Sequence, residues 1–451
     1  MNAAVRLKMF FRKPYNVILV VLFVALVLLT LLPLLSIVMD TVTVHSSEVM
    51  RIHGTHAGDF TDYHWRKVLM DGQNSINIFY KPLWNTIMIS IATCVIAIGC
   101  GGGMAWLITR SDIRFKPLLS ALFVVPYIMP SWTLALAWLD FFRNPLVGGV
   151  PGIFTALTGI VTPNWFAYGF FPISVVQGLH YAPFAYILIG GILKHMDANL
   201  EEAAQLLHAS RMQILKRITL PMVKPAILST FLLAFSSSMS AFAVPAFLGA
   251  PVRYQVLTTQ LYRTLQGLNP GYGYLMALVL ILIGVGIMLV NQKVLDSRKS
   301  YTTITGKSSQ ISLVKLRSLR NPLSVILSIL LICVTVVPLF NFAVESFIVE
   351  PGNYSLSNFS TVFWTGAGST DIANGEPGIL RNHSVYRGLI NSLVLSVICA
   401  FFAGTIGILA GYSIVRKKGT FLSNAVSHLT FFPYLIPSMA FGAIYLSMFS
   451  V

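Results

Sequence analysis

The chain contains nine apolar stretches of about 20 residues, the length that an α-helix needs to cross roughly 30 Å of hydrocarbon. Because 55% of its 451 residues are hydrophobic and only 10% are charged, too few polar side chains remain to cover a water-soluble globule. We therefore expect an all-α, polytopic membrane protein. The predicted spans lie near 16–39, 85–108, 118–141, 171–193, 225–248, 274–292, 323–346, 390–415 and 425–450.

The net charge of +16 follows from where the basic residues lie between these spans. If the N-terminus is cytoplasmic, 22 of the 31 Lys and Arg but only 5 of the 15 Asp and Glu fall in cytoplasmic segments. This distribution satisfies the positive-inside rule, so we expect a cytoplasmic N-terminus. No basic run is interleaved with aromatic residues on a polar face, which argues against nucleic-acid binding. The first span exceeds the length of a signal peptide and lacks a cleavage motif, which favours an uncleaved anchor.

The sequence also repeats itself some 300 residues further on. Residues 85–110 align without a gap with residues 391–416, and the motif Pro-Tyr-x-x-Pro-Ser at 126–131 recurs at 433–438. The repeat predicts two tandem copies of one membrane module, inserted with the same orientation, with a pathway along the seam between them. The predicted parts are a six-helix module at 1–296, a basic, Ser/Thr-rich cytoplasmic linker at 297–320 and a three-helix second module at 321–451.

A polar helical segment, 197–221, separates the fourth and fifth spans. It contains Glu202-Ala203-Ala204, a turn position at His208 and, after nine intervening residues, Ile218-Thr219-Leu220-Pro221. This pattern resembles the EAA loop by which the membrane subunits of bacterial binding-protein-dependent ABC importers contact their ATPase. The resemblance extends over essentially the whole chain. It implies a coupling loop that contains Glu201, Glu202, Ala203, Ala204, Leu207, His208, Ile218, Leu220 and Pro221.

The residue types in this segment suit a docking helix. Asp197 or Asn199 can cap a short amphipathic helix whose first turn is acidic, which is favourable at the positive end of a helix dipole. The two alanines allow a partner to approach the backbone, and Leu206 and Leu207 can enter an apolar groove. The family has glycine where this chain has His208, so we expect a positive φ there at a cost of about 1 kcal/mol.

Pro221 is expected to end the helix that follows the turn, before the next membrane span begins. The alternative for the whole segment is an ordinary cytoplasmic helical hairpin with no partner.

Two sets of residues are candidates for a transport pathway or gate. The paired proline motifs fall early in the third span of each copy, where proline loosens a helix, and membranes tolerate this mainly beside protein or water. The serines of 236–240 are expected midway along the fifth span, where their hydroxyls face neighbouring helices or cargo. Simple kinks and helix packing are the respective alternatives. The candidates are Pro126, Pro130, Ser236, Ser237, Ser240, Pro433 and Pro437.

Histidines and cysteines were weighed as metal ligands. Four histidines crowd the first outer loop beside several acidic residues, but the loop lacks clear periodicity, and we favour docking of a substrate-binding protein over a metal site. The four cysteines lie in apolar runs without CxxC spacing, so we expect packing roles and no disulfide or zinc site. These residues are His45, His53, His56, His64, Cys94, Cys100, Cys333 and Cys399.

The energy source is expected to lie outside this chain. Charged residues are nearly absent from the interior of the spans, whereas an ion-coupled carrier usually needs buried acids at mid-depth. The sequence has no GxxxxGK pattern followed by Ser or Thr, no catalytic triad and no metal-ligand helix. We therefore expect no enzymatic activity, no cofactor and no resident metal. A separate ATPase dimer on the cytoplasmic side is implied by the resemblance.

The resemblance implies the transmembrane permease of a bacterial ABC importer in the inner membrane, supplied by a binding protein on the outer side. Fused permeases of this length class are similar to the ferric-iron import family, with polyamine and 2-aminoethylphosphonate permeases as relatives, so iron(III) is the favoured substrate. A second coupling loop would lie near position 509, beyond Val451. We expect an incomplete reading frame, or a separate polypeptide that completes the second copy. An ion-coupled secondary carrier and a non-transporting membrane scaffold are the alternative functions.

Overall fold

The structure is a computed structural model. It describes residues 9–52, 54–196, 198–267, 269–298, 313–368, 375–435 and 438–449. Over these residues the chain forms α-helices with short 3₁₀ and π segments and isolated β-bridges, but no strand. The predicted all-α fold is therefore confirmed. Helices suit a bilayer because they satisfy their backbone hydrogen bonds internally, where no water is available to do so.

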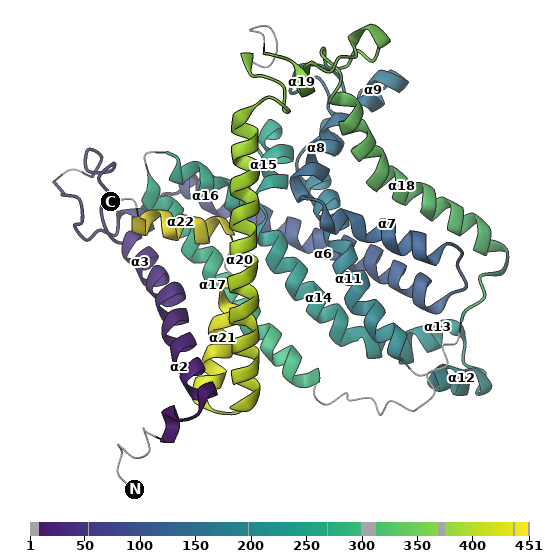
Figure 1. Cartoon of the computed structure of the whole chain (residues 1–451), viewed down its shortest axis with the longest axis horizontal. Helices are drawn as coiled ribbons and strands as arrows, with labels where there is room; N and C mark the ends of the chain where they lie inside the picture. Colours follow the sequence, from purple (N-terminus) through teal and green to yellow (C-terminus); the bar gives the residue numbers. More distant parts are fainter. Residues whose placement is uncertain are drawn as a thin grey trace. The chain divides into compact units, whose positions relative to one another are not determined.

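The chain divides into two compact units (Figure 1). Unit 1 consists of Met1–Thr61 with Val344–Val451, and unit 2 consists of Asp62–Ala343. These boundaries differ from those of the predicted modules. The first helix of the first predicted module lies in unit 1, together with later helices of the second module. The first helix of the second module lies mainly in unit 2, together with later helices of the first module. A compact unit is therefore not the same set of residues as a sequence repeat.

Unit 2 is built around three helices that pack on one another: α6 (Lys81–Arg110), α11 (Phe170–His195) and α14 (Leu220–Ser240). Small residues allow the close approach of α6 and α11. A Cβ added to Gly101 of α6 would lie 2.6 Å from the Ala185 Cβ of α11. The other principal helices of unit 2 are α4 (Tyr63–Leu69), α7 (Lys116–Ile128), α8 (Ser131–Phe142), α9 (Ile153–Thr158), α10 (Asn164–Ala167), α12 (Ala198–Leu206), α13 (Arg211–Ile214), α15 (Ala243–Gly249), α16 (Leu257–Leu265), α17 (Pro270–Arg298) and α18 (Arg320–Glu345).

Unit 1 is composed of residues from both terminal parts of the chain. α2 (Pro14–Leu26) packs on α20 (His383–Arg416) and α21 (Phe421–Leu435) through a cluster that includes Leu19 and Val426. α20 is mostly exposed: only 6% of its most apolar stretch is buried, against 39% for the span that contains α6. The remaining principal helices of unit 1 are α3 (Leu32–Asp40), α19 (Val362–Thr365) and α22 (Ser438–Phe449).

Nine membrane spans were predicted, whereas the described residues form seven helices that are long and apolar enough to cross a membrane, or eight if one bent pair counts as a span. The expected third span, 118–141, is broken into α7 and α8 with a bend of 100°. The expected ninth span, 425–450, is covered by two shorter helices, α21 and α22. The third span was predicted as one segment and is divided into two helices, whereas residues 436 and 437 of the ninth span lie outside the described residues.

Proline accounts for the break between α7 and α8. Pro130 has no N–H, and its ring would clash with the carbonyl of Pro126, four residues earlier, if the helix continued. Met129, immediately before Pro130, is extended with φ −68° and ψ 141°, as the residue before proline prefers. α21 ends at Leu435 and α22 begins at Ser438, which are the positions of Ile128 and Ser131 shifted by the repeat offset of 307.

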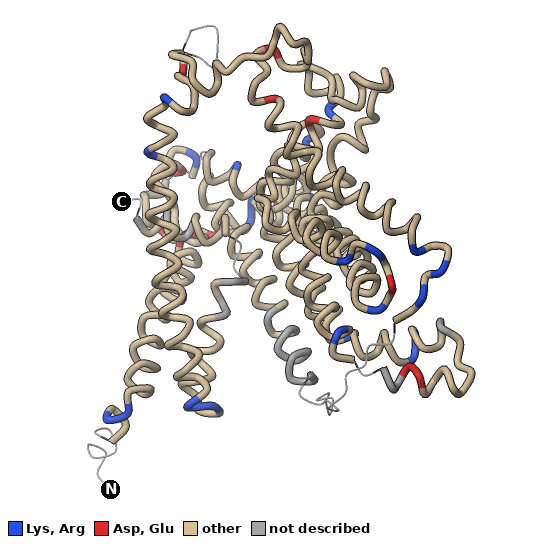
Figure 2. The backbone as a smooth tube through the Cα atoms, turned by 45° about the vertical axis from the view of Figure 1, so that its right-hand side comes forward, with Lys and Arg blue, Asp and Glu red and all other residues tan. Residues whose placement is uncertain are grey.

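Proline also accounts for three π-helical turns. They cover Val27–Leu31, Ile76–Tyr80 and Leu215–Thr219, and each ends two residues before a proline. A wider turn allows the helix to pass a proline without the clash that an α-helical turn would impose. These three helices therefore continue past a proline at which the sequence pattern would predict a helix end. Figure 2 shows that Lys and Arg gather at the ends of the helices of unit 2, including the turn that joins α6 to α7.

Candidate functional site

The segment between α11 and α14 contains two short helices joined by a tight turn. α12 ends in a Schellman motif, in which the His208 N–H donates to Gln205 O at 2.9 Å and the Ala209 N–H donates to Ala204 O at 3.0 Å. This motif needs a left-handed residue just past the helix end, and His208 has a φ of 59°. The predicted positive φ at the family's glycine position is therefore confirmed.

The next helix, α13, begins with a capping box. Ser210 accepts a hydrogen bond on Oγ from the Gln213 N–H at 3.3 Å, and the Ser210 N–H donates to Gln213 Oε1 at 2.8 Å. The sequence analysis missed these two residues, although Ser-x-x-Gln before a helix is a recognisable signal. The cap of α12 and the cap of α13 together satisfy backbone groups on both sides of the turn, which fixes its shape.

Of the two N-cap candidates, Asn199 lies inside α12, and Asp197 lies outside the described residues. One other detail of the predicted segment was wrong. Pro221 does not end a helix, because α13 continues through the π turn Leu215–Thr219 into α14. Pro221 is the second residue of α14 and directly follows this wider turn. Ile218, in the π turn, is half-buried, and Leu220 is exposed.

One face of α12 is open. Glu202, Ala203 and His208 are exposed, and Ala204 is half-buried. Leu206 and Leu207 expose 81% and 83% of their surface, although both are large apolar residues. Figure 1 shows α12 at the edge of unit 2, beyond the ends of the long helices. An apolar pair held outward beside small residues is suited to a helix-in-groove contact.

Glu201, by contrast, faces inward. Its Oε1 lies 2.9 Å from Arg110 Nη2, at the end of α6, and accepts a hydrogen bond from Thr219 Oγ1 at 3.2 Å. Arg110 exposes 1% of its surface and Glu201 exposes 8%. Glu201 was assigned to the coupling loop together with Glu202, but the two neighbouring carboxylates lie on opposite sides of α12. Only Glu202 is available to a partner.

The proline candidates of the first repeat form a single structural feature. Pro126 lies within α7, and Pro130 directly precedes α8. The carbonyl of Pro126, which Pro130 cannot bond, lies 2.7 Å from His180 Nδ1 of α11. His180 was not identified from the sequence. Pro433 lies within α21, and Pro437 lies outside the described residues.

The serine candidates lie at the end of α14 and not midway along a span, because the helix stops at Ser240. Ser236 is buried and Ser237 is half-buried, while Ser240 Oγ donates to the Ser236 carbonyl at 2.9 Å. The residue that ties this stretch to its neighbours is Ser238, which donates to Gln177 Oε1 of α11 at 2.5 Å. Gln177 is fully buried and was missed, because a single glutamine in an apolar stretch carries no periodic signal.

The histidines of the outer loop have separate environments. His45 Nε2 lies 2.9 Å from the Asp40 carbonyl, in unit 1. His64 is fully buried in unit 2, where its ring meets Tyr272 edge-on. His53 lies outside the described residues. Within the part of the chain that is described, no group of three or more His, Cys, Asp or Glu could hold a metal ion.

The cysteines also depart from the expectation. Only Cys94 is buried, as a packing residue would be, and Cys100, Cys333 and Cys399 are exposed. Cys333 borders an apolar pocket of about 270 Å³ between α8, α11 and α18, which Trp138, Phe142 and Pro338 also line. This pocket offers almost no polar atoms, so it does not suit a polar cargo.

Comparison with known proteins shows what part of this chain is similar to. Residues 97–301 match the family of binding-protein-dependent transport system inner membrane components. This region begins within α6 and contains the whole segment from α12 to α14. The family consists of transport permeases, which are not enzymes. The matched residues are therefore similar to the membrane components of such transport systems.

Individual relatives agree on this class. The chain is 26% identical over 384 residues to the ferric transport system permease protein FbpB of Actinobacillus pleuropneumoniae, which covers 82% of this chain and 52% of the relative. It is 30% identical over 159 residues to the sulfate transport system permease protein CysT of Salmonella typhimurium, covering 35% and 54%. The spermidine/putrescine transport system permease protein PotC of Escherichia coli is 26% identical over 219 residues, covering 48% and 74%.

The chain spans about half the length of the FbpB relative that it matches. Among solved structures, a bacterial ABC transporter involved in the import of the acidic polysaccharide alginate has a TM-score of 0.43 and 16% identity, and covers 54% of this chain and 85% of its own. The same transporter in complex with its pentasaccharide-bound periplasmic protein has a TM-score of 0.45 and 17% identity, and covers 61% and 90%.

Proposed function

We propose that the chain is the transmembrane permease subunit of a bacterial ABC importer. It moves a substrate, delivered by a binding protein on the outer side, into the cytoplasm when a separate ATPase dimer acts on the segment 198–221. The observation that supports this most is the open face of α12, which carries the EAA pattern on an outward-facing helix with Leu206 and Leu207 exposed. The distribution of Lys and Arg supports a cytoplasmic location for this segment and for the N-terminus.

We also propose that the chain holds residues of two tandem copies of the permease module. The support is the Pro-Tyr-x-x-Pro-Ser motif of the α7/α8 break, which recurs in the sequence at 433–438 at the offset of the repeat. α6 and α20 also end at arginines in equivalent positions of the repeat, Arg110 and Arg416.

Iron(III) is the proposed substrate, since a relative that covers most of this chain is named a ferric transport permease. Polyamine and phosphonate are the alternatives, and the sulfate and spermidine/putrescine permeases show that similar sequences serve different cargoes. We place the gate at the α7/α8 break and the end of α14, where Pro126, Pro130 and Ser236–Ser240 lie. A packing kink is the alternative for the prolines.

The test is ATPase association in membranes that contain the chain and the ATPase encoded beside it. We expect Glu202→Lys to abolish co-purification of the ATPase, because it reverses the charge of the exposed carboxylate on α12. Glu350→Lys is the matched control, since it makes the same substitution at an exposed glutamate of the segment between α18 and α20. Unchanged association of the Glu202→Lys chain would remove the docking assignment.

The orientation is tested separately. Leu206→Cys, in a chain without its native cysteines, should react with a membrane-impermeant maleimide only in inside-out vesicles. Labelling from outside intact cells would place α12 on the wrong side for an ATPase. Transport that survives ATP depletion but collapses with the ion gradient would favour a secondary carrier, and failure of any ATPase to co-purify would favour a scaffold.

A further inference from the structure

Arg110 connects two parts of unit 2 that are distant in sequence. Its guanidinium meets Glu201 of α12 at 2.9 Å, and Glu201 is held in turn by Thr219 at the start of α14. The whole arrangement is buried. A buried ion pair resists separation, because moving either partner away leaves an uncompensated charge in a poorly solvated site. α12 therefore cannot shift relative to the end of α6 without moving Arg110.

The backbone of the same residue holds the chain that leads into α18. The Val314 N–H donates to the Arg110 carbonyl at 2.8 Å, and the Asp112 N–H donates to the Val314 carbonyl at 3.2 Å. These two bonds make a short parallel bridge between the turn after α6 and the residues before α18.

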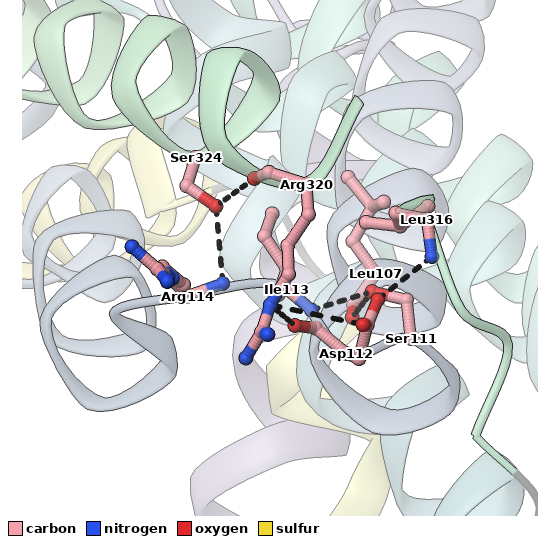
Figure 3. A network of polar contacts seen from close by, with 8 residues as sticks. All are labelled: Leu107, Ser111, Asp112, Ile113, Arg114, Leu316, Arg320 and Ser324. Atoms are coloured by element: carbon pink, nitrogen blue, oxygen red, sulfur yellow. Dashed lines mark hydrogen bonds and ion pairs between the residues drawn. The ribbon is translucent and has the colours of Figure 1, made fainter. Parts of the chain in front are cut away.

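Asp112 and Arg114 extend this attachment into α18 itself (Figure 3). The Leu316 N–H donates to Asp112 Oδ1 at 2.8 Å, and Arg320 Nε donates to the Asp112 carbonyl at 2.7 Å. The Arg114 N–H donates to Ser324 Oγ at 3.0 Å, one turn into α18. Figure 3 shows the turn lying against the first turns of α18, with Asp112 and Arg320 side by side. Residues 110–114 thus hold the start of α18 at several points.

We infer that residues 110–114 form a relay that transmits a displacement of α12 to α18. α18 is the first helix of the second sequence copy, whereas α12 belongs to the first. One ATPase contact on α12 then moves helices of both copies, because Arg110 joins α12 to the turn and Asp112 joins the turn to α18. The inference rests on the proposed function only for the origin of the displacement. The contacts themselves belong to this chain alone, so they can be tested without an ATPase.

The first experiment uses the full chain in lipid nanodiscs and measures hydrogen exchange of the peptide 313–324. Glu201→Gln removes the charge that holds Arg110, and we expect about tenfold faster exchange at Val314 and Leu316, whose N–H groups bond to the relay. Glu202→Gln, the same substitution at the exposed neighbour, should leave this peptide unchanged. Glu201→Asp, which keeps the charge, should restore most of the protection.

The direction of transmission is tested with a second substitution. Asp112→Ala removes the carboxylate that accepts from the Leu316 N–H but leaves the backbone bonds of the turn, so adding Glu201→Gln in this background should have a smaller further effect on the peptide 313–324. Arg114→Ala is the matched control in the same turn, because Arg114 contributes only its backbone N–H and its side chain is exposed. Equal exchange in the Glu201→Gln and Glu202→Gln chains, or an undiminished Glu201→Gln effect in the Asp112→Ala background, would overturn the relay.

The second experiment adds the partner ATPase and a non-hydrolysable ATP analogue. We expect nucleotide-dependent exchange changes in both peptides 198–210 and 313–324, and a smaller change at 313–324, but not at 198–210, in the Asp112→Ala chain. A nucleotide response at 198–210 without one at 313–324 in the unmodified chain would refute the relay. Failure of the ATPase to bind the unmodified chain would instead contradict the proposed function, while the first experiment would still decide the relay.

Discussion

The contact between α6 and α11 can be tested with one methyl group. A Cβ added to Gly101 would meet the Ala182 carbonyl and would lie 2.6 Å from Ala185 Cβ and 2.9 Å from Tyr186 N. Ordinary contacts between heavy atoms are about 3.5–4.0 Å, so α11 must move away by about 1 Å. Two of these three atoms belong to the backbone and cannot rotate out of the way.

The expected magnitude follows from two opposing effects. Overpacking a close contact costs about 1–3 kcal/mol, and the upper end applies because the partner is backbone. Replacing glycine by alanine within a helix stabilises the helix by about 1 kcal/mol. Overpacking at the upper end costs about 3 kcal/mol, and the gain in helix propensity offsets about 1 kcal/mol of it. Gly101→Ala should therefore lower the free energy of unfolding by about 2 kcal/mol.

Gly103 provides a matched control in the same helix, because a Cβ there has no neighbour within 4 Å. Gly103→Ala should raise the free energy of unfolding by up to about 1 kcal/mol, so the two variants should differ by about 3 kcal/mol. Gly407, the repeat counterpart of Gly101 in α20, also has no neighbour within 4 Å, and its alanine variant should behave like Gly103→Ala. Equilibrium unfolding by SDS in mixed micelles measures all three. A Gly101→Ala chain as stable as the Gly103→Ala chain would refute the close packing.

Three further predictions concern the coupling segment and the broken span. His208→Gly should stabilise the chain by about 1 kcal/mol in the same unfolding assay, because glycine adopts the left-handed Schellman position without strain; a loss of stability would contradict the cap. Arg110→Ala should cost about 3–5 kcal/mol, whereas replacing Arg110 and Glu201 together by Met and Leu should cost far less, since no buried charge is left unpaired; equal losses would exclude the ion pair. Pro130→Ala should reduce the 100° bend, measured as a longer spin-label distance between the far ends of α7 and α8; an unchanged distance would assign the bend to packing.

Several local features of the candidate site were accessible from the sequence. The left-handed turn at His208 follows from short-range hydrogen bonding at the end of α12, and the EAA spacing located it correctly. The capping box of Ser210 and Gln213 was equally local and could have been found from its spacing. The break before Ser131 was also within reach, because two prolines four residues apart oppose a continuous helix. The sequence analysis predicted that these prolines loosen the third span, but it did not predict the division into two helices.

The effect of Pro221 could not be predicted in the same way. A proline normally ends a helix when the preceding turn is α-helical, but here the π turn Leu215–Thr219 allows the helix to continue. Whether a helix continues through a wider turn or ends depends on how much free energy the packing of the following residues contributes. Residues of α14 pack on α6 and α11, and this contact favours continuation.

The sequence by itself determined the all-α membrane architecture, the charge asymmetry and the position of the polar segment, because apolar length, basic residues between spans and turn chemistry act over short stretches of chain. Only the tertiary structure decided that Glu201 turns inward to Arg110 while Glu202 faces out, that Gly101 lies at a helix contact while Gly103 does not, and that α18 is attached to the turn at Asp112. These outcomes depend on which helix faces which, and adjacent residues of identical type carry no record of that choice in the sequence.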